Sequence, residues 1–202
     1  MILTVASFKG GVGKTTTAIH LASYFSRKAP TVLIDGDPNR SSSTWAARGN
    51  PKFHVAGEHQ IAMYARKCEH LIIDTKARPE PQDLKALADG CDLLILPCTP
   101  DPFSLDALLM TIEALRQLGN KDYRILLTIV PPKPMTDGDN ARQTLVNAGL
   151  PVFKGEIRRT VAFQRAALDG VTVDEVVKGG DIATQAWSDY VAIGKEIEQR
   201  NG

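Results

Sequence analysis

Short apolar runs that alternate with helix-like stretches constrain the fold of this chain more than any other feature. The five clearest runs are nearly uniform in their apolar character: Ile2–Ala6, Thr31–Ile34, Leu71–Ile73, Leu93–Leu96 and Ile125–Val130. Uniform runs of this length are typical of parallel strands that are covered on both faces. Weaker candidates for strands are Phe53–Val55 and Val152–Phe153.

Between these runs lie stretches with the periodicity of amphipathic helices. They are Thr15–Ser26, Ser104–Leu118 and Ile182–Ile197, each with apolar residues recurring at intervals of three and four. Alternation of strands and helices predicts an α/β fold, a doubly wound and mostly parallel sheet with helices on both faces. With 202 residues and no linker or repeat, residues 1–202 are expected to form one domain.

Composition excludes several classes of protein. Lys and Arg number 24 against 23 Asp and Glu, so an anionic partner requires a local basic patch. The three cysteines, Cys68, Cys91 and Cys98, are too few and too scattered for a disulfide framework, a zinc site or an iron–sulfur scaffold. No apolar run approaches the ~20 residues of a membrane span, and no signal peptide is visible. We therefore expect a cytoplasmic protein.

A glycine-rich loop follows the first predicted strand. It reads Lys9-Gly10-Gly11-Val12-Gly13-Lys14-Thr15, with Thr16 next, and the helix pattern begins at once. Strand, glycine loop, Lys-Thr and helix occur in the order of a P-loop, in which backbone N–H groups bind phosphate oxygens. Lys14 is expected to neutralise the phosphates and the Thr15 hydroxyl to bind Mg²⁺. Phe8 stands where the strict pattern has glycine, so this loop is a variant P-loop.

Acidic residues follow the next two strands along the expected sheet. Asp35-Gly36-Asp37-Pro38 ends one strand, and Asp74 ends the run His70–Ile73. In parallel sheets ligands bind beyond the carboxyl ends of strands, so these carboxylates are expected near the phosphates. Asp74 fits a Walker B residue that binds Mg²⁺ through water. An aspartate-rich turn that merely closes a strand is the alternative for Asp35 and Asp37.

The loop and the acidic motifs together resemble the ParA/MinD family of ATPases, of the small ParA type that includes ParF plasmid-partition and McdA carboxysome-positioning proteins. Lys9 through Thr16 resembles that family's deviant Walker A box, and Asp35-Gly36-Asp37-Pro38 resembles its Asp-x-Asp-Pro motif. The resemblance implies a Mg²⁺-dependent ATPase that forms an ATP-bound sandwich homodimer. Lys9 would act on the partner subunit's phosphates, Asp37 would position the attacking water, and Asp35 would support the Mg²⁺ shell. A solvated surface lysine is the alternative for Lys9.

Two further assignments follow from this resemblance. Pro131 and Pro132 lie where relatives hold the adenine ring. A basic segment holds four cations against one acidic residue, Glu156, where relatives present DNA-contacting arginines: Lys154, Arg158, Arg159 and Arg165. Nonspecific double-stranded DNA of the nucleoid and a ParB/McdB-like adaptor are the implied partners, and the implied role is positioning of a cargo such as a plasmid or carboxysome. A solvated helix face is the alternative for the basic segment.

Two other functions stay open from the sequence. A MinD-like membrane-associated ATPase requires a basic amphipathic tail, whereas the tail here balances Lys195 and Arg200 with Glu196 and Glu198, so no membrane partner is expected. A small-molecule P-loop kinase uses the same phosphate and Mg²⁺ groups, and Asp37 would then serve as a base for a substrate hydroxyl.

Overall fold

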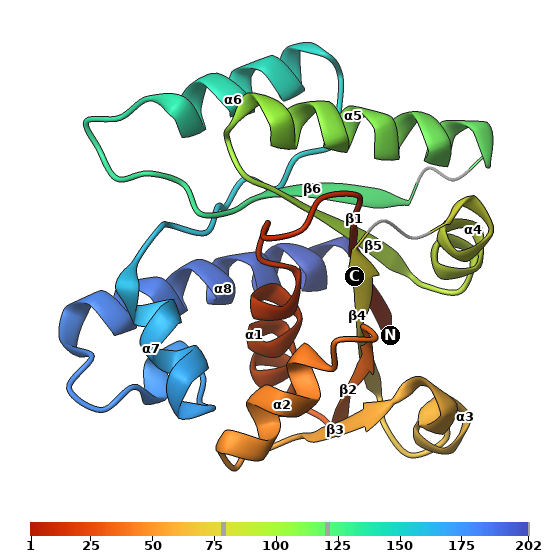
Figure 1. Ribbon diagram of the computed structural model, residues 1–202, viewed down its shortest axis with the longest axis vertical. Coiled ribbons are helices and arrows are strands. Elements are labelled where there is room, and N and C mark those ends of the chain that lie inside the picture. The colour runs from red at the N-terminus through yellow and green to blue at the C-terminus, as the bar shows by residue number, and fades with distance from the viewer. Residues whose placement is uncertain (78–79, 120–121, 202) are drawn as a thin grey trace.

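In a computed structural model, which describes residues 1–77, 80–119 and 122–201, the chain forms a six-stranded sheet with helices on both faces (Figure 1). The strands are β1 (Ile2–Ser7), β2 (Thr31–Gly36), β3 (His54–Gly57), β4 (His70–Ala77), β5 (Leu93–Cys98) and β6 (Tyr123–Leu127). They lie in the order β3-β2-β4-β1-β5-β6, and every strand pair is parallel. The predicted doubly wound α/β fold is confirmed.

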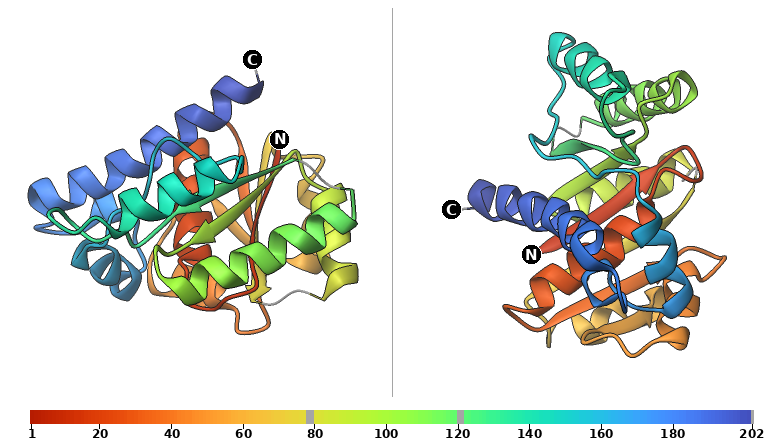
Figure 2. Two further views of the ribbon diagram at one scale, coloured as in Figure 1. Left: turned by 90° about the horizontal axis from the view of Figure 1, so that it is seen from above. Right: turned by 90° about the vertical axis from the view of Figure 1, so that its left-hand side faces the viewer.

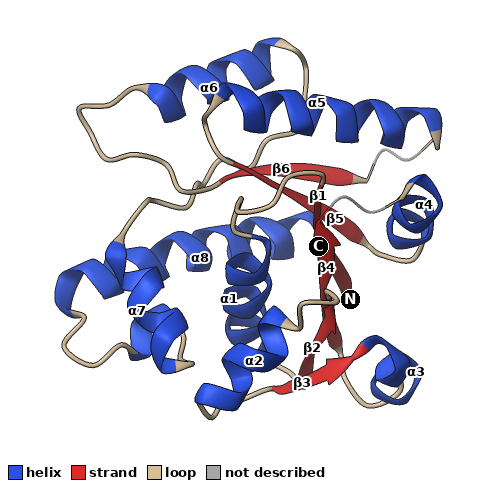
Figure 3. Cartoon of the chain, in the orientation of Figure 1, coloured by secondary structure: helices blue, strands red, loops and turns tan. Residues whose placement is uncertain are grey.

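The described part of the chain also holds eight helices and two 3₁₀ turns, some between the strands and the rest after β6 (Figure 3). The helices are α1 (Lys14–Ser26), α2 (Ser41–Arg48), α3 (Ile61–Tyr64), α4 (Pro81–Asp89), α5 (Pro102–Gln117), α6 (Asp137–Asn147), α7 (Val161–Asp169) and α8 (Gly180–Asn201). The 3₁₀ turns are η1 (Glu58–Gln60) and η2 (Val173–Glu175). None of the described helices is long and apolar enough to cross a lipid bilayer.

The two faces of the sheet bury separate apolar cores. Along β4, Ile72 packs with α1 and α8, whereas its neighbour Leu71 packs with α3 on the opposite face. This alternation follows from the two-residue period of a strand, and it requires apolar residues at consecutive positions when both faces are covered. Viewed from above, α5 and α8 lie on opposite sides of the strands (Figure 2, left).

The strand register brings two acidic residues together at one end of the sheet. Asp35 of β2 lies opposite Asp74 of β4, and Asp74 lies opposite Val5 of β1. The loop from β1 to α1 therefore starts beside both carboxylates. The carboxyl edge of the central strands positions the predicted site, as expected for a parallel sheet.

Two strand predictions differ from the structure. The run Ile125–Val130 was expected to be one strand, but β6 ends at Leu127 because Ile129 adopts a left-handed backbone conformation, with φ of 54°. Val130 forms only an isolated bridge with Arg158. The weak candidate Val152–Phe153 forms no strand either, since Val152 makes a single bridge to Ile125.

Candidate nucleotide-binding site

Residues 8–13 form the loop between β1 and α1, and two of its three glycines adopt a backbone conformation that other residues rarely reach. Gly11 has φ of 78° and Gly13 has φ of 81°. Gly13 is the N-cap of α1, and no side chain caps the helix there. The first N–H groups of α1 therefore lack side-chain partners and point out of the helix end, which favours a bound anion.

A cavity of about 420 Å³ opens at this helix end, and we call it the phosphate cavity after the residues predicted to line it. Its lining brings most of the predicted phosphate-binding residues together with Asp37: Gly10, Gly11, Gly13, Lys14, Thr15, Thr16, Asp37, Asn39, Ser41, Ala77 and Ile129. Val12 does not line the cavity, because its side chain is buried and its carbonyl accepts a hydrogen bond from Thr128 Oγ1 at 2.8 Å. Lys9 is also absent from this lining.

Lys14 and Asp74 are two buried charges beside this cavity. Burial lowers the pKa of Lys14, and the nearby carboxylates of Asp74 and Asp37 oppose that shift. Burial raises the pKa of Asp74 to about 6, against the Ser42 and Thr15 hydroxyls, which favour its charged form. Without a ligand, the two groups only partly compensate the loss of hydration that each suffers.

The residues around Asp74 fit a magnesium ion. Asp74 Oδ2 accepts a hydrogen bond from Ser42 Oγ at 2.7 Å, whereas its buried Oδ1 has no hydrogen-bond partner among the described residues. An orphaned carboxylate oxygen near a threonine hydroxyl is the hard oxygen chemistry that Mg²⁺ prefers. In the described residues no three His, Cys, Asp or Glu side chains converge on a metal site. Mg²⁺ needs none, because phosphates and water supply its other ligands.

Asp35 differs from Asp74 because the protein itself satisfies its carboxylate. Its Oδ2 accepts hydrogen bonds from the backbone N of Ser43 at 2.7 Å and from Ser43 Oγ at 2.6 Å. Its Oδ1 accepts one from the backbone N of Asp37 at 3.2 Å. Asp35 thus fixes the loop from β2 to α2, and any support it gives to a metal ion passes through that loop.

Asp37 lies on this loop and borders the phosphate cavity. Its Oδ1 accepts hydrogen bonds from the backbone N and Nδ2 of Asn39, at 2.9 and 3.0 Å. These bonds orient the carboxylate at the border of the cavity, and acceptor capacity is left for a water molecule.

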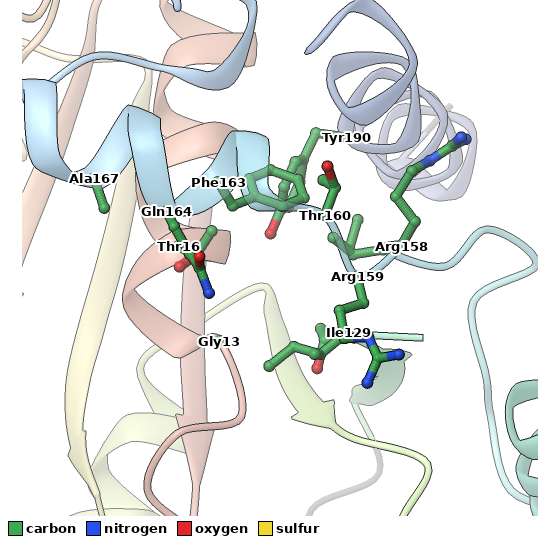
Figure 4. A pocket seen from close by; sticks show the side chains of 12 residues that line it. Gly13, Thr16, Ile129, Arg158, Arg159, Thr160, Phe163, Gln164, Ala167 and Tyr190 are labelled. Carbon is green, nitrogen blue, oxygen red and sulfur yellow. The ribbon is translucent and has the colours of Figure 1, made fainter. Parts of the chain in front are cut away.

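A second cavity, of about 250 Å³, adjoins the first and shares Gly13, Thr16 and Ile129 with it (Figure 4). The surface of this cavity is largely apolar. Its further lining residues, of mixed polarity, come from distant parts of the chain: Thr128, Ile157, Arg158, Arg159, Thr160, Phe163, Gln164, Ala167 and Tyr190. Neither Pro131 nor Pro132, the predicted adenine contacts, lines it; Pro131 borders a separate cleft beside Asp101. The sequence did not identify Ile129, Phe163 and Tyr190 as lining residues of a cavity, because they belong to no local motif.

The four residues of the basic segment differ in their surroundings. Arg158 forms a bidentate ion pair with Asp189 of α8, with Nε to Oδ2 at 2.8 Å and Nη2 to Oδ1 at 2.7 Å. Arg159 points instead toward Ile129 and lines the second cavity (Figure 4). Lys154 and Arg165 are exposed. Only Arg165 lies on a helix, α7, so the alternative of one solvated helix face does not describe the segment.

The glycine loop, the phosphate cavity and the acidic strand ends define a P-loop nucleotide-binding protein. Residues 3–173 match the family model of the CobQ/CobB/MinD/ParA nucleotide-binding domain, and the chain belongs to this family.

Three particular proteins show which members of this family the chain is similar to. The chain is 33% identical over 205 residues to the maintenance of carboxysome distribution protein A of Gloeobacter kilaueensis, covering 98% of this chain and 94% of the relative. Among solved structures, a plasmid partition protein of Borrelia burgdorferi bound to AMPPNP matches with a TM-score of 0.77, at 17% identity and 99% coverage of both chains. An ATP complex of McdA from Cyanothece matches with a TM-score of 0.70, at 18% identity and 96% coverage of both chains. At these identities the structural matches establish the fold.

Proposed function

We propose that this protein is a Mg²⁺-dependent ATPase that hydrolyses ATP to ADP and phosphate. The convergence of Lys14, Thr15 and Asp37 on one cavity at the start of α1 carries the proposal. The buried carboxylate of Asp74 lies behind this lining, close enough to interact with Lys14 and the Thr15 hydroxyl. Lys14 and the backbone N–H groups of Gly10 to Thr16 would bind the phosphates, and Thr15 and Asp74 would hold Mg²⁺, with Asp35 behind them. Bound Mg²⁺ supplies charge neutralisation at the phosphates. Asp37 would orient the attacking water.

The second cavity is the place proposed for the nucleoside. It adjoins the phosphate cavity through Gly13 and Thr16, and its apolar lining suits a flat aromatic ring better than the polar P-loop does. This replaces Pro131 and Pro132 with Ile129 and Phe163 as the proposed neighbours of the base.

The hydrolysis would drive a positioning switch. The similarity to carboxysome-distribution and plasmid-partition proteins supports this role over other uses of a P-loop. In the ATP state two copies would form a sandwich homodimer, with Lys9 of each acting on the phosphates of the other, and the dimer would bind nonspecific nucleoid DNA. A ParB/McdB-like adaptor would stimulate hydrolysis and release the dimer. A plasmid or a carboxysome is the kind of cargo implied.

DNA contact is proposed for the exposed cations Lys154, Arg159 and Arg165. We propose a weaker contribution of Arg158 to DNA binding, because its guanidinium is already paired with Asp189. Lysine and arginine contacts to phosphates are independent of base sequence and weaken as salt rises.

The alternatives have less support. A MinD-like membrane attachment would need a free apolar face on the last helix, but Tyr190, Ile193 and Ile197 of α8 are already buried against the sheet and α1. A small-molecule kinase would need an acceptor beside Asp37.

Phosphate release measured with Mg²⁺ and ATP tests the proposed chemistry. We expect slow release by the wild-type protein, none by Asp37→Ala, and ATP binding retained by Asp37→Ala but lost by Lys14→Ala. Asp106→Asn, an exposed one-charge change on α5, is the control and should behave as wild type. Undiminished release by Asp37→Ala would contradict its assigned role, and release that requires an added hydroxyl acceptor would favour the kinase.

Binding to a nonspecific DNA duplex tests the proposed switch. Asp37→Ala should bind DNA with ATP and not with ADP, and binding should weaken steeply between low and physiological salt. Binding that ignores the nucleotide, or no binding in any state, would contradict nucleoid association.

A further inference from the structure

Lys9 lies on the P-loop, yet its side chain leaves the phosphate cavity. Its backbone N donates to Ser7 Oγ at 3.1 Å, and its carbonyl accepts from Lys14 Nζ at 3.5 Å, so the backbone is held within the loop. Its ammonium instead forms an ion pair with Asp101 Oδ1 at 2.9 Å, on the loop between β5 and α5. In this arrangement the Lys9 side chain does not line the phosphate cavity of its own chain, and its ammonium is paired with Asp101.

Asp101 is an oriented acceptor for that ammonium. It is the N-cap of α5, with Oδ1 accepting from the backbone N of Ser104 at 3.0 Å, and the Thr99 hydroxyl donates to its Oδ2. Partial burial alone would raise the pKa of Asp101, but Thr99, Lys9 and Ser104 together outweigh burial and hold it below its usual range. The contacts with Thr99 and Ser104 do not involve Lys9, so they fix the direction of the carboxylate whether or not Lys9 is paired with it.

We propose that Asp101 is a positioning residue for Lys9: in the free chain it holds the ammonium on its own subunit, and ATP-dependent dimerisation must break this contact. The inference rests on the proposed function, in which Lys9 acts on the partner subunit's phosphates. One ammonium cannot pair with Asp101 and a second subunit's phosphates at once, so the two contacts compete. Asp101 thereby sets how readily the nucleotide-bound dimer forms.

The contact is weak enough to be reversible. The side chains of Lys9 and Asp101 are 31% and 42% exposed. Ion pairs this open to solvent shift an equilibrium by at most about fivefold each. A symmetric dimer breaks two of them, so removing the contact should strengthen the dimer by up to about 25-fold.

The test is the dimer dissociation constant at saturating AMP-PNP and Mg²⁺, measured by sedimentation for the full chain. Asp101→Asn keeps an N-cap acceptor for α5 and removes the charge, so it should tighten the dimer by about 2- to 25-fold, with a smaller gain at high salt. Asp101→Glu restores the charge and should return the constant toward wild type. Glu69→Gln, an exposed one-charge change just before β4 at the other end of the sheet, should leave it unchanged. An unchanged or weaker Asp101→Asn dimer, or an equal gain in Glu69→Gln, would overturn the proposal.

A second readout needs no dimer. In the nucleotide-free chain, Lys9→Ala should raise the pKa of the Asp101 carboxyl, followed by carbon NMR, while Thr99, Ser104 and the neighbouring Arg159 stay as they are. An unchanged pKa would mean that the ion pair does not exist in solution, and would overturn the proposal by itself. If the pKa rises but the wild-type protein never dimerises with any nucleotide, the proposed function fails and the competition has no partner to act against.

Discussion

At the scale of single residues, the buried carboxylate of Asp74 shows how the site is prepared for a cation. Its side chain is inaccessible to solvent, and one of its oxygens has no hydrogen-bond partner within the part of the chain that the structure describes. Burial raises its pKa to about 6, so ionisation costs free energy in the folded protein that it does not cost in the unfolded chain. Burying this carboxylate with one unpaired oxygen thus lowers the stability of the folded protein, and a bound Mg²⁺ would reverse that loss.

Asp74→Asn tests this loss through the pH dependence of stability. Below the unfolded-state pKa of about 4 the carboxyl is mostly neutral in both states, so the free energies of unfolding of variant and wild type should converge there. As pH rises toward 6, the unfolded chain ionises first and the wild type loses stability relative to the variant. Well above pH 6 the variant should be more stable by about 3 kcal/mol, the free energy of a rise in pKa from 3.8 to about 6. Chemical denaturation without Mg²⁺ at pH 4 and pH 7.5 measures this, and a variant less stable at pH 7.5 would contradict the prediction.

At the scale of elements, the close approach of α1 and α8 is the packing on which the P-loop helix depends. Gly194 of α8 lies against the ring of Tyr24, and a Cβ at this position would overlap that ring. His20, also on α1, links this helix to η2. Its Nδ1 hydrogen-bonds the Thr16 carbonyl, and its Nε2 accepts from the backbone N of Val173 at 3.0 Å. Helix α8 therefore helps to hold the helix that presents the phosphate-binding N–H groups.

Gly194→Ala should therefore destabilise the protein although alanine favours helices. Overpacking a tight contact costs about 2 kcal/mol, which exceeds the helix-propensity gain of ~1 kcal/mol. The control is Lys195→Ala, at an exposed position of the same helix. Urea denaturation measures both, and a Gly194→Ala variant as stable as wild type would show that α1 and α8 can separate without cost.

Arg158 and Arg165 provide a second contrast between elements. Because Arg158 is paired with Asp189 on α8, Arg158→Ala should lower the free energy of unfolding by about 1 kcal/mol and change DNA affinity little. Arg165→Ala should leave stability unchanged and weaken binding to all DNA sequences, with a shallower salt dependence. Denaturation and DNA titration of both variants measure this, and the reverse pattern would contradict the assignment.

What the sequence predicted, and what it did not, follows from how local each feature is. Strands buried on both faces appear as continuous apolar runs, and the P-loop is one contiguous motif, so both were recognisable. Helices α2 and α6 carry few apolar residues in a regular pattern and were not predicted. The cavity beside Phe163 and the pairing of Lys9 with Asp101, 92 residues apart, exist only once the chain has folded.

At the scale of the whole molecule, the proposed active form requires a second copy of the chain. The two faces of the sheet are covered by helices, and the phosphate cavity lies at its carboxyl edge, between the glycine loop and the loop from β2 to α2. Phe103, in the first turn of α5, is 79% exposed although it is aromatic. An exposed aromatic side chain next to the Lys9–Asp101 pair is consistent with a surface that is covered in another state of assembly.

The molecular mass of the Asp37→Ala protein, measured by light scattering with Mg²⁺ and ATP, with ADP and without nucleotide, tests the central claim most directly. We predict a mass of 21.9 kDa without nucleotide and with ADP, and twice that mass only with Mg²⁺ and ATP. A mass of 21.9 kDa in all three states, or a dimer in all three, would contradict an ATP-switched dimer.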